Sequence, residues 1–122
     1  MRGLGELESA VMDVVWEAHA PMLVRDVLEA LAPDRPLAYT TVLTVLDKLH
    51  GKGWVRREQV GRAFAYTPVA SREEVGARLL REVLESSGDV ERVLLHFARS
   101  SSPEEARILR RALGAENVAE EP

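Results

Sequence analysis

The chain has 122 residues and a formal net charge of −4, which argues against a polycation-type nucleic-acid binder. Its 46 % apolar content excludes wholesale disorder, and its length suits one domain or one small domain with an appendage. It contains no cysteine, which excludes disulfides and thiolate metal sites, and no apolar run approaches the roughly 18 residues that span a bilayer.

The first residues show neither the apolar core nor the cleavage site of a signal peptide, so we expect a soluble cytoplasmic protein. Apolar residues recur at helical spacing from Gly5 to about His19, where Pro21 ends the predicted helix. Met22-Leu23 is predicted as a short connection or a stub of strand. A second helix is predicted for residues 24–32, before a Pro-Asp-Arg-Pro stretch breaks it.

A third helix is predicted from Ala38 to the glycines at 51 and 53. At about 100° per residue, its apolar side chains share one narrow arc: Val42, Val45, Leu46 and Leu49. The opposite face is polar and slim, with Thr40, Thr44, Asp47, Lys48 and Gly51, and with Thr41 at its flank. Because β-branched threonines are poor helix formers, their grouping on the exposed face favours a function there.

Two strand-like runs, residues 54–59 and 63–69, flank Val60-Gly61-Arg62 and predict a β-hairpin. The end of the third helix and this hairpin together form a basic stripe. Residues 48–62 have a net charge of +4, whereas residues 71–122 have −3. By alternation along the strand, Arg56 and Arg57 face opposite sides of the hairpin, so at most one of them can contact a given partner surface.

Three more helices are predicted after Pro68, each with a single apolar stripe. A capping box at Ser71 to Glu74 begins the first, Asp89 caps the second, and Pro103 takes the first position of the third. The last helix is predicted to end at Gly114, before a frayed acidic tail. We therefore predict two domains, residues 1–69 and residues 70–122.

Three helices followed by a hairpin, with a basic stripe across helix and hairpin, are typical of a winged helix-turn-helix in a mostly α (α+β) fold. A helix fits the major groove, and threonine can contact a phosphate, a base edge or a thymine methyl. Arginine at a hairpin tip can reach the backbone or the minor groove. The predicted DNA contacts are Thr40, Thr41, Thr44, Lys48, Lys52, Arg57 and Arg62.

Nearly the whole chain resembles the penicillinase and methicillin-resistance repressor family (BlaI/MecI type), and its composition and motifs are most similar to those of actinobacterial members. The matching stretches are LGELESAVMDVVWEA, VRDVLEAL, LAYTTVLTVLDKLHGKGWVRRE and GRAFAYTPVASREE. The resemblance implies a homodimeric repressor whose winged helix binds inverted-repeat operator DNA and whose C-terminal helices interlock. The residues that it assigns to the dimer are Leu80, Val83, Leu84, Val93, Leu94, Phe97, Leu109 and Leu113.

The resemblance also implies a switch, in which a β-lactam sensor linked to a protease causes the repressor to be cut before a phenylalanine. The corresponding bond here is His96–Phe97, although the better-known members have asparagine before that phenylalanine. Whether or not this bond is cut, we expect Phe97 to be an aromatic of the dimer core. Thr40 and Asp47 also depart from the family pattern, so the operator sequence does not carry over.

Other readings remain open from the residues alone. Lys52 could serve the helix dipole, and Tyr39, Tyr66, Trp16 and Trp54 suit packing. A winged-helix protein–protein adaptor would fit the acidic total charge of the chain. A metal-responsive repressor would share the fold, but the cysteines that such repressors use are absent from this sequence. No pattern of catalytic residues, resident metal site or cofactor site is found, and we expect no enzyme activity.

Overall fold

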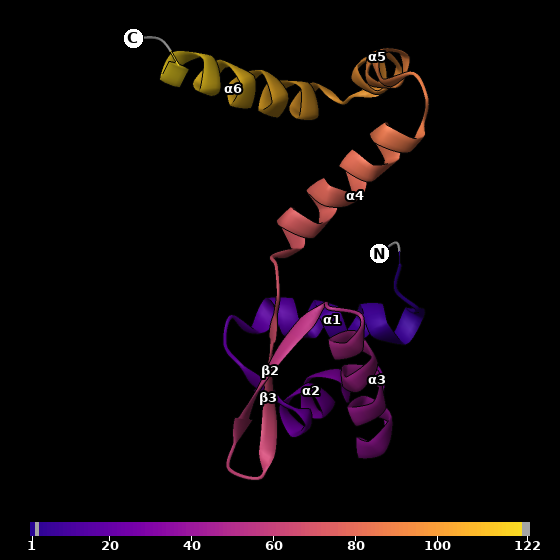
Figure 1. Cartoon of the computed structure of the whole chain (residues 1–122), viewed down its shortest axis with the longest axis vertical. Helices are drawn as coiled ribbons and strands as arrows, with labels where there is room; N and C mark the ends of the chain where they lie inside the picture. The colour runs from indigo at the N-terminus through magenta and orange to yellow at the C-terminus, as the bar shows by residue number, and fades with distance from the viewer. Residues whose placement is uncertain (2, 121–122) are drawn as a thin grey trace. The chain divides into compact units, whose positions relative to one another are not determined.

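The computed structural model describes residues 1 and 3–120, with side chains described up to residue 114. The described residues form six helices and three strands (Figure 1): α1 (Glu6–Ala18), β1 (Met22–Leu23), α2 (Val24–Leu31), α3 (Tyr39–Gly51), β2 (Val55–Val60), β3 (Ala63–Pro68), α4 (Arg72–Ser86), α5 (Val90–Ser100) and α6 (Pro103–Glu120).

The chain divides into two compact units, Met1–Arg78 and Leu79–Pro122, here called the winged-helix unit and the helical unit. Their boundary falls inside α4, whereas the sequence suggested a boundary just before that helix. None of the helices in the described part of the chain is long and apolar enough to cross a membrane.

The sheet of the winged-helix unit is antiparallel and has the strand order β1-β3-β2. Met22 pairs with Tyr66, so the predicted stub of strand is real and extends the hairpin to three strands. Strands β2 and β3 pair from Val55↔Pro68 to Val60↔Ala63, which leaves a two-residue turn at the tip. Gly61 begins that turn with φ +63°, a left-handed geometry that glycine adopts without a Cβ clash. We call β2, β3 and their turn the wing.

One hydrophobic core joins the helices of the winged-helix unit to its sheet. Val42, Val45, Leu46 and Leu49 of α3 are all buried, which confirms the predicted apolar arc. They pack with buried side chains of α1, α2 and the sheet, of which Tyr66 is the largest. Burying each such aliphatic side chain contributes about 1.5–3 kcal/mol, which outweighs the low helix propensity of the threonines.

The helix ends follow the sequence signals closely, with one exception. Ser71 Oγ accepts a hydrogen bond from the Glu74 backbone N–H at 3.1 Å, and Asp89 accepts one from Arg92, which confirms both predicted caps. However, α6 continues to Glu120, past its predicted end at Gly114. A glycine inside a helix costs only about 1 kcal/mol and removes no hydrogen bond, so it need not end the helix. Residues 121–122 of the predicted tail lie outside the described residues.

The helical unit has no buried core of its own within the described side chains. From Leu79 to Gly114 every described side chain is exposed or half-buried. Large apolar side chains are among the exposed ones, including Leu80, Leu94, Phe97, Leu109 and Leu113. Apolar exposure on this scale is unusual for a monomeric protein.

Candidate DNA-binding interface

The exposed face of α3 lies opposite its buried arc, as predicted. Thr40, Thr44 and Lys48 are exposed and Thr41 is half-buried. Thr44 Oγ1 donates a hydrogen bond to the Thr40 carbonyl oxygen at 2.9 Å, so the hydroxyl lies close against the helix. The face therefore combines a narrow profile near the start of the helix with a cation one turn later, which suits entry into a major groove.

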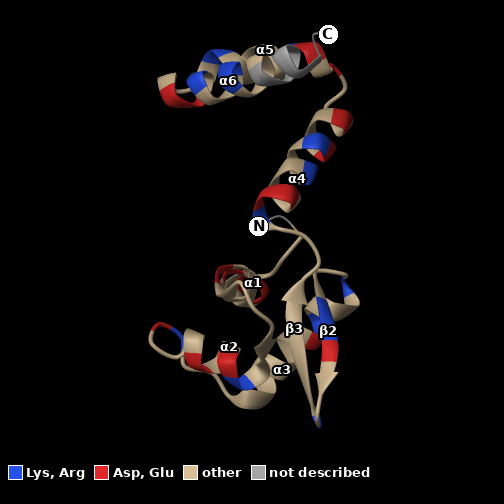
Figure 2. Ribbon diagram, turned by 90° about the vertical axis from the view of Figure 1, so that its left-hand side faces the viewer, with Lys and Arg blue, Asp and Glu red and all other residues tan. Residues whose placement is uncertain are grey.

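Basic and acidic positions both occur along β2 of the wing (Figure 2). Because successive side chains in a strand alternate, its two adjacent arginines, Arg56 and Arg57, face opposite sides of the sheet. Arg57 pairs across the ladder with buried Tyr66, and its guanidinium lies 4.4 Å from the ring centroid of Phe64. Arg57 Nη1 also lies 3.3 Å from Asp47 Oδ1 on α3. Arg57 is thus the arginine that faces α3, and part of its charge is already matched by a carboxylate.

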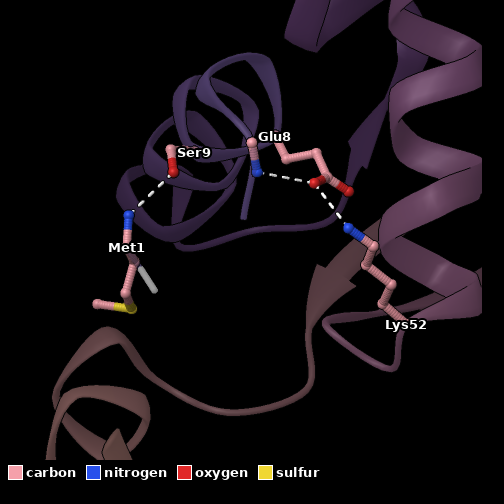
Figure 3. Close-up of polar contacts among 5 residues, drawn as sticks. Met1, Glu8, Ser9 and Lys52 are labelled. Atoms are coloured by element: carbon pink, nitrogen blue, oxygen red, sulfur yellow. Dashed lines mark hydrogen bonds and ion pairs between the residues drawn. The ribbon is translucent and has the colours of Figure 1, made fainter. Parts of the chain in front are cut away.

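Lys52 has a partner within the protein (Figure 3). Its Nζ lies 2.8 Å from Oε1 of Glu8, which is buried and also accepts a hydrogen bond from the Gly5 backbone N–H at 2.9 Å. These hydrogen bonds, first from Gly5 and then from Lys52, hold the pKa of the Glu8 carboxyl below its usual value although burial opposes them. Lys52 therefore joins the end of α3 to the start of α1, and its contact with DNA stays a prediction.

Ion pairing separates the cations of the winged-helix unit into two groups. Arg35 is paired with Glu6 and Arg72 with Asp13, in addition to the pairs of Lys52 and Arg57. Among the described residues, the cations without a carboxylate partner in this unit are Arg25, Lys48, Arg56, Arg62 and Arg78. Lys48 and Arg62 were predicted contacts, whereas Arg25 was not singled out because it stands alone in the sequence of α2.

The aromatic residues divide in a way that the sequence did not indicate. Tyr66 is fully buried and Trp16 and Trp54 are half-buried with their rings edge to face at 6.3 Å, as expected for packing. Tyr39 is 50 % exposed, so only part of its side chain packs against the protein. Ala38 precedes the helix without a side-chain cap, and this leaves Tyr39 at an open helix start.

The residues predicted for dimerisation and cleavage lie on α4, α5 and α6. His96 and Phe97 are both exposed on α5. Of the eight dimer residues, Leu84 and Val93 are half-buried and the other six are exposed. Within the described residues, no cluster of three or more His, Asp or Glu side chains could hold a metal ion.

Comparison with known proteins places these features in context. Residues 4–115 match the family model described as penicillinase repressor. The transcriptional regulator BlaI from two Mycobacterium tuberculosis strains, CDC 1551 / Oshkosh and H37Rv, is 46 % identical over 113 residues, which cover 90 % of this chain and 82 % of the relative. The solution structure of the DNA-binding domain of the repressor BlaI matches 59 % of this chain and 87 % of its own, with 28 % identity and a TM-score of 0.52.

Proposed function

Because the chain belongs to the penicillinase repressor family, a family of DNA-binding regulators and not of enzymes, we propose that it represses transcription as a homodimer. It is a transcriptional repressor that binds operator DNA, and each winged-helix unit of the dimer occupies one half of an inverted repeat. The observation that supports this most directly is the exposed threonine and Lys48 face of α3, held outward by its buried arc.

The exposed apolar side chains of the helical unit support the dimer. On α5, exposed Val90, Leu94 and Phe97 and half-buried Val93 recur at helical spacing, and a second copy of the chain is the partner that would remove such a stripe from water. A two-fold dimer also matches the symmetry of an inverted-repeat operator.

The switch that we propose is a cut between His96 and Phe97 by a protease linked to a β-lactam sensor. Both residues are exposed on α5, so a local opening of that helix would give a protease access to the bond. A cut there would separate α6 and part of α5 from the winged-helix unit and weaken the dimer. Such a repressor would act in the cytoplasm. If the cut occurs, mass spectrometry of the protein from β-lactam-treated cells should detect fragments 1–96 and 97–122.

Binding to a duplex from the promoter region of its own gene tests the proposed function. We expect the affinity to fall by about 10³-fold or more between 50 and 200 mM salt, because each neutralised phosphate releases counterions. An unrelated duplex of the same length is the control and should bind more weakly at every salt concentration. If no promoter fragment is retained even at 50 mM salt, the repressor function is wrong.

A further inference from the structure

A cleft of about 520 Å³ opens in the winged-helix unit beside the start of α3. Four elements contribute to it: the end of β1, the first residues of α2, the first two turns of α3, and the wing. The side chains that matter for its chemistry are Arg25, Tyr39, Leu43, Arg62, Phe64 and Tyr66. The cleft thus lies immediately next to Thr40, at the same end of α3 as the face assigned to DNA.

The charge of this cleft is entirely positive. Arg25 and Arg62 line it, and no aspartate or glutamate does. Neither arginine forms an ion pair or a side-chain hydrogen bond within the described part of the protein, whereas Arg35 and Arg57 of the same unit are both bound to carboxylates. Two uncompensated guanidinium groups at one cleft are complementary to an anion.

The walls of the cleft increase the strength of such an interaction. Tyr66 is fully buried, and Leu43 and the Phe64 ring add apolar surface. An apolar wall lowers the local dielectric constant, which strengthens attraction between a guanidinium and an anion. Tyr39 is half exposed at the same place, where its phenol can donate a hydrogen bond to an anionic oxygen.

From this geometry we infer that the cleft receives a backbone phosphate of double-stranded DNA, and that Arg25 of α2 is a DNA-binding residue together with Arg62. The inference rests on the proposed function. Continuity with the threonine face decides the occupant: when the start of α3 enters a major groove, the phosphates that border the groove pass beside its first turn. The contact positions the protein on the duplex and reads no base.

The test measures binding of the full chain to the promoter duplex by fluorescence anisotropy between 50 and 200 mM salt. Arg25→Gln should weaken binding on the order of fivefold and lower the slope of log affinity against log salt by about one per protomer. Arg62→Gln should act in the same way, and Arg25→Lys should keep most of the slope because a phosphate accepts a point charge. Arg35→Gln is the matched control, since Arg35 is bound to Glu6 and does not line the cleft.

Three outcomes are distinguishable. Loss of slope in Arg25→Gln and Arg62→Gln, with Arg35→Gln unchanged, supports the inference. Wild-type affinity and slope in Arg25→Gln overturn it. A wild-type chain that binds no promoter duplex contradicts the proposed function itself, which is a separate result.

Discussion

The carboxylate of Asp47 on α3 lies 3.3 Å from the guanidinium of Arg57 on the wing, and this ion pair joins the helix to the wing. Asp47 shares the exposed face of α3 with Thr44 and Lys48, where an unmatched negative charge would repel phosphates. Arg57 offsets that charge and is itself held against the Phe64 ring. The side chains of Asp47 and Arg57 are 52 % and 33 % exposed, so the pair contributes only about 0–1 kcal/mol to stability, and we expect its main effect to be on DNA binding.

Replacing Asp47 by asparagine should therefore strengthen DNA binding. The change removes one negative charge from the DNA face and frees Arg57, so we expect severalfold tighter binding at 50 mM salt and a salt slope steeper by about one per protomer. Fluorescence anisotropy on the promoter duplex measures both. Asp34→Asn, which removes an exposed carboxylate without an ion pair, is the control. Weaker binding by Asp47→Asn alone would mean that Asp47 accepts a hydrogen bond from a base.

Substitutions of Lys48 and Lys52 should affect different properties, the first DNA binding and the second the stability of the fold. Lys52→Ala leaves the buried Glu8 carboxylate without its cation, so we expect a loss of about 1–3 kcal/mol in the free energy of unfolding. Lys48→Ala should change stability by less than about 0.5 kcal/mol but lower the salt slope of DNA binding. Urea unfolding and anisotropy on both variants measure these effects. Equal stability of the two variants would show that the Glu8–Lys52 contact does not hold α3 to α1.

The Glu8 carboxyl gives the fold a defined acid sensitivity. Its pKa is lower in the folded protein than the usual value near 4.3, because it is hydrogen-bonded to Gly5 and Lys52 in its charged form. The stability that it contributes is therefore complete above about pH 4.3 and is lost as the pH falls through the lower folded value. Thermal unfolding should show Glu8→Gln less stable than the wild type at pH 7, with the difference shrinking towards pH 3. A constant difference across that range would contradict this linkage.

The double variant Thr44→Ala plus Lys48→Ala tests which face of α3 meets DNA. Each contact with a base or phosphate is worth about 1–3 kcal/mol, and a dimer loses them twice, so operator binding should disappear. The dimer should remain, because both residues lie in the winged-helix unit. Anisotropy measures the binding, and sedimentation at the same concentration measures the association state. Normal DNA binding by this variant would place the interface on another face.

Phe97 and Leu95 provide a matched pair for the dimer. They are 49 % and 46 % exposed on α5, but only Phe97 lies on the stripe with Val93 and Leu94. Phe97→Ala should weaken dimerisation by a few kcal/mol if the second copy buries the ring, whereas Leu95→Ala should have a small effect. Sedimentation equilibrium gives the two dissociation constants. A constant unchanged by Phe97→Ala removes Phe97 from the interface.

The features that could be predicted from the sequence are those that depend on near neighbours along the chain. The buried arc of α3, the wing and the caps at Ser71 and Asp89 follow from periodicity, turn residues and short side-chain-to-backbone bonds. An ion pair of Asp47 with a nearby lysine or arginine is open to prediction, but the choice of Arg57 depends on strand register, and the contact Glu8–Lys52 depends on how the helices cross. The cleft near Tyr39 likewise needs α2, α3 and the wing in place, so the isolated Arg25 gave no signal.

The hydrogen bond from Thr44 Oγ1 to the Thr40 carbonyl oxygen uses the only proton of that hydroxyl. While this bond persists, Thr44 can offer only lone pairs to a base edge. In the major groove, the amino groups of adenine and cytosine can donate to such an oxygen, whereas O4 of thymine and O6 of guanine present lone pairs of their own. A hydrogen bond within one helical turn thereby makes Thr44 favour a base that presents a hydrogen-bond donor over one that presents an acceptor.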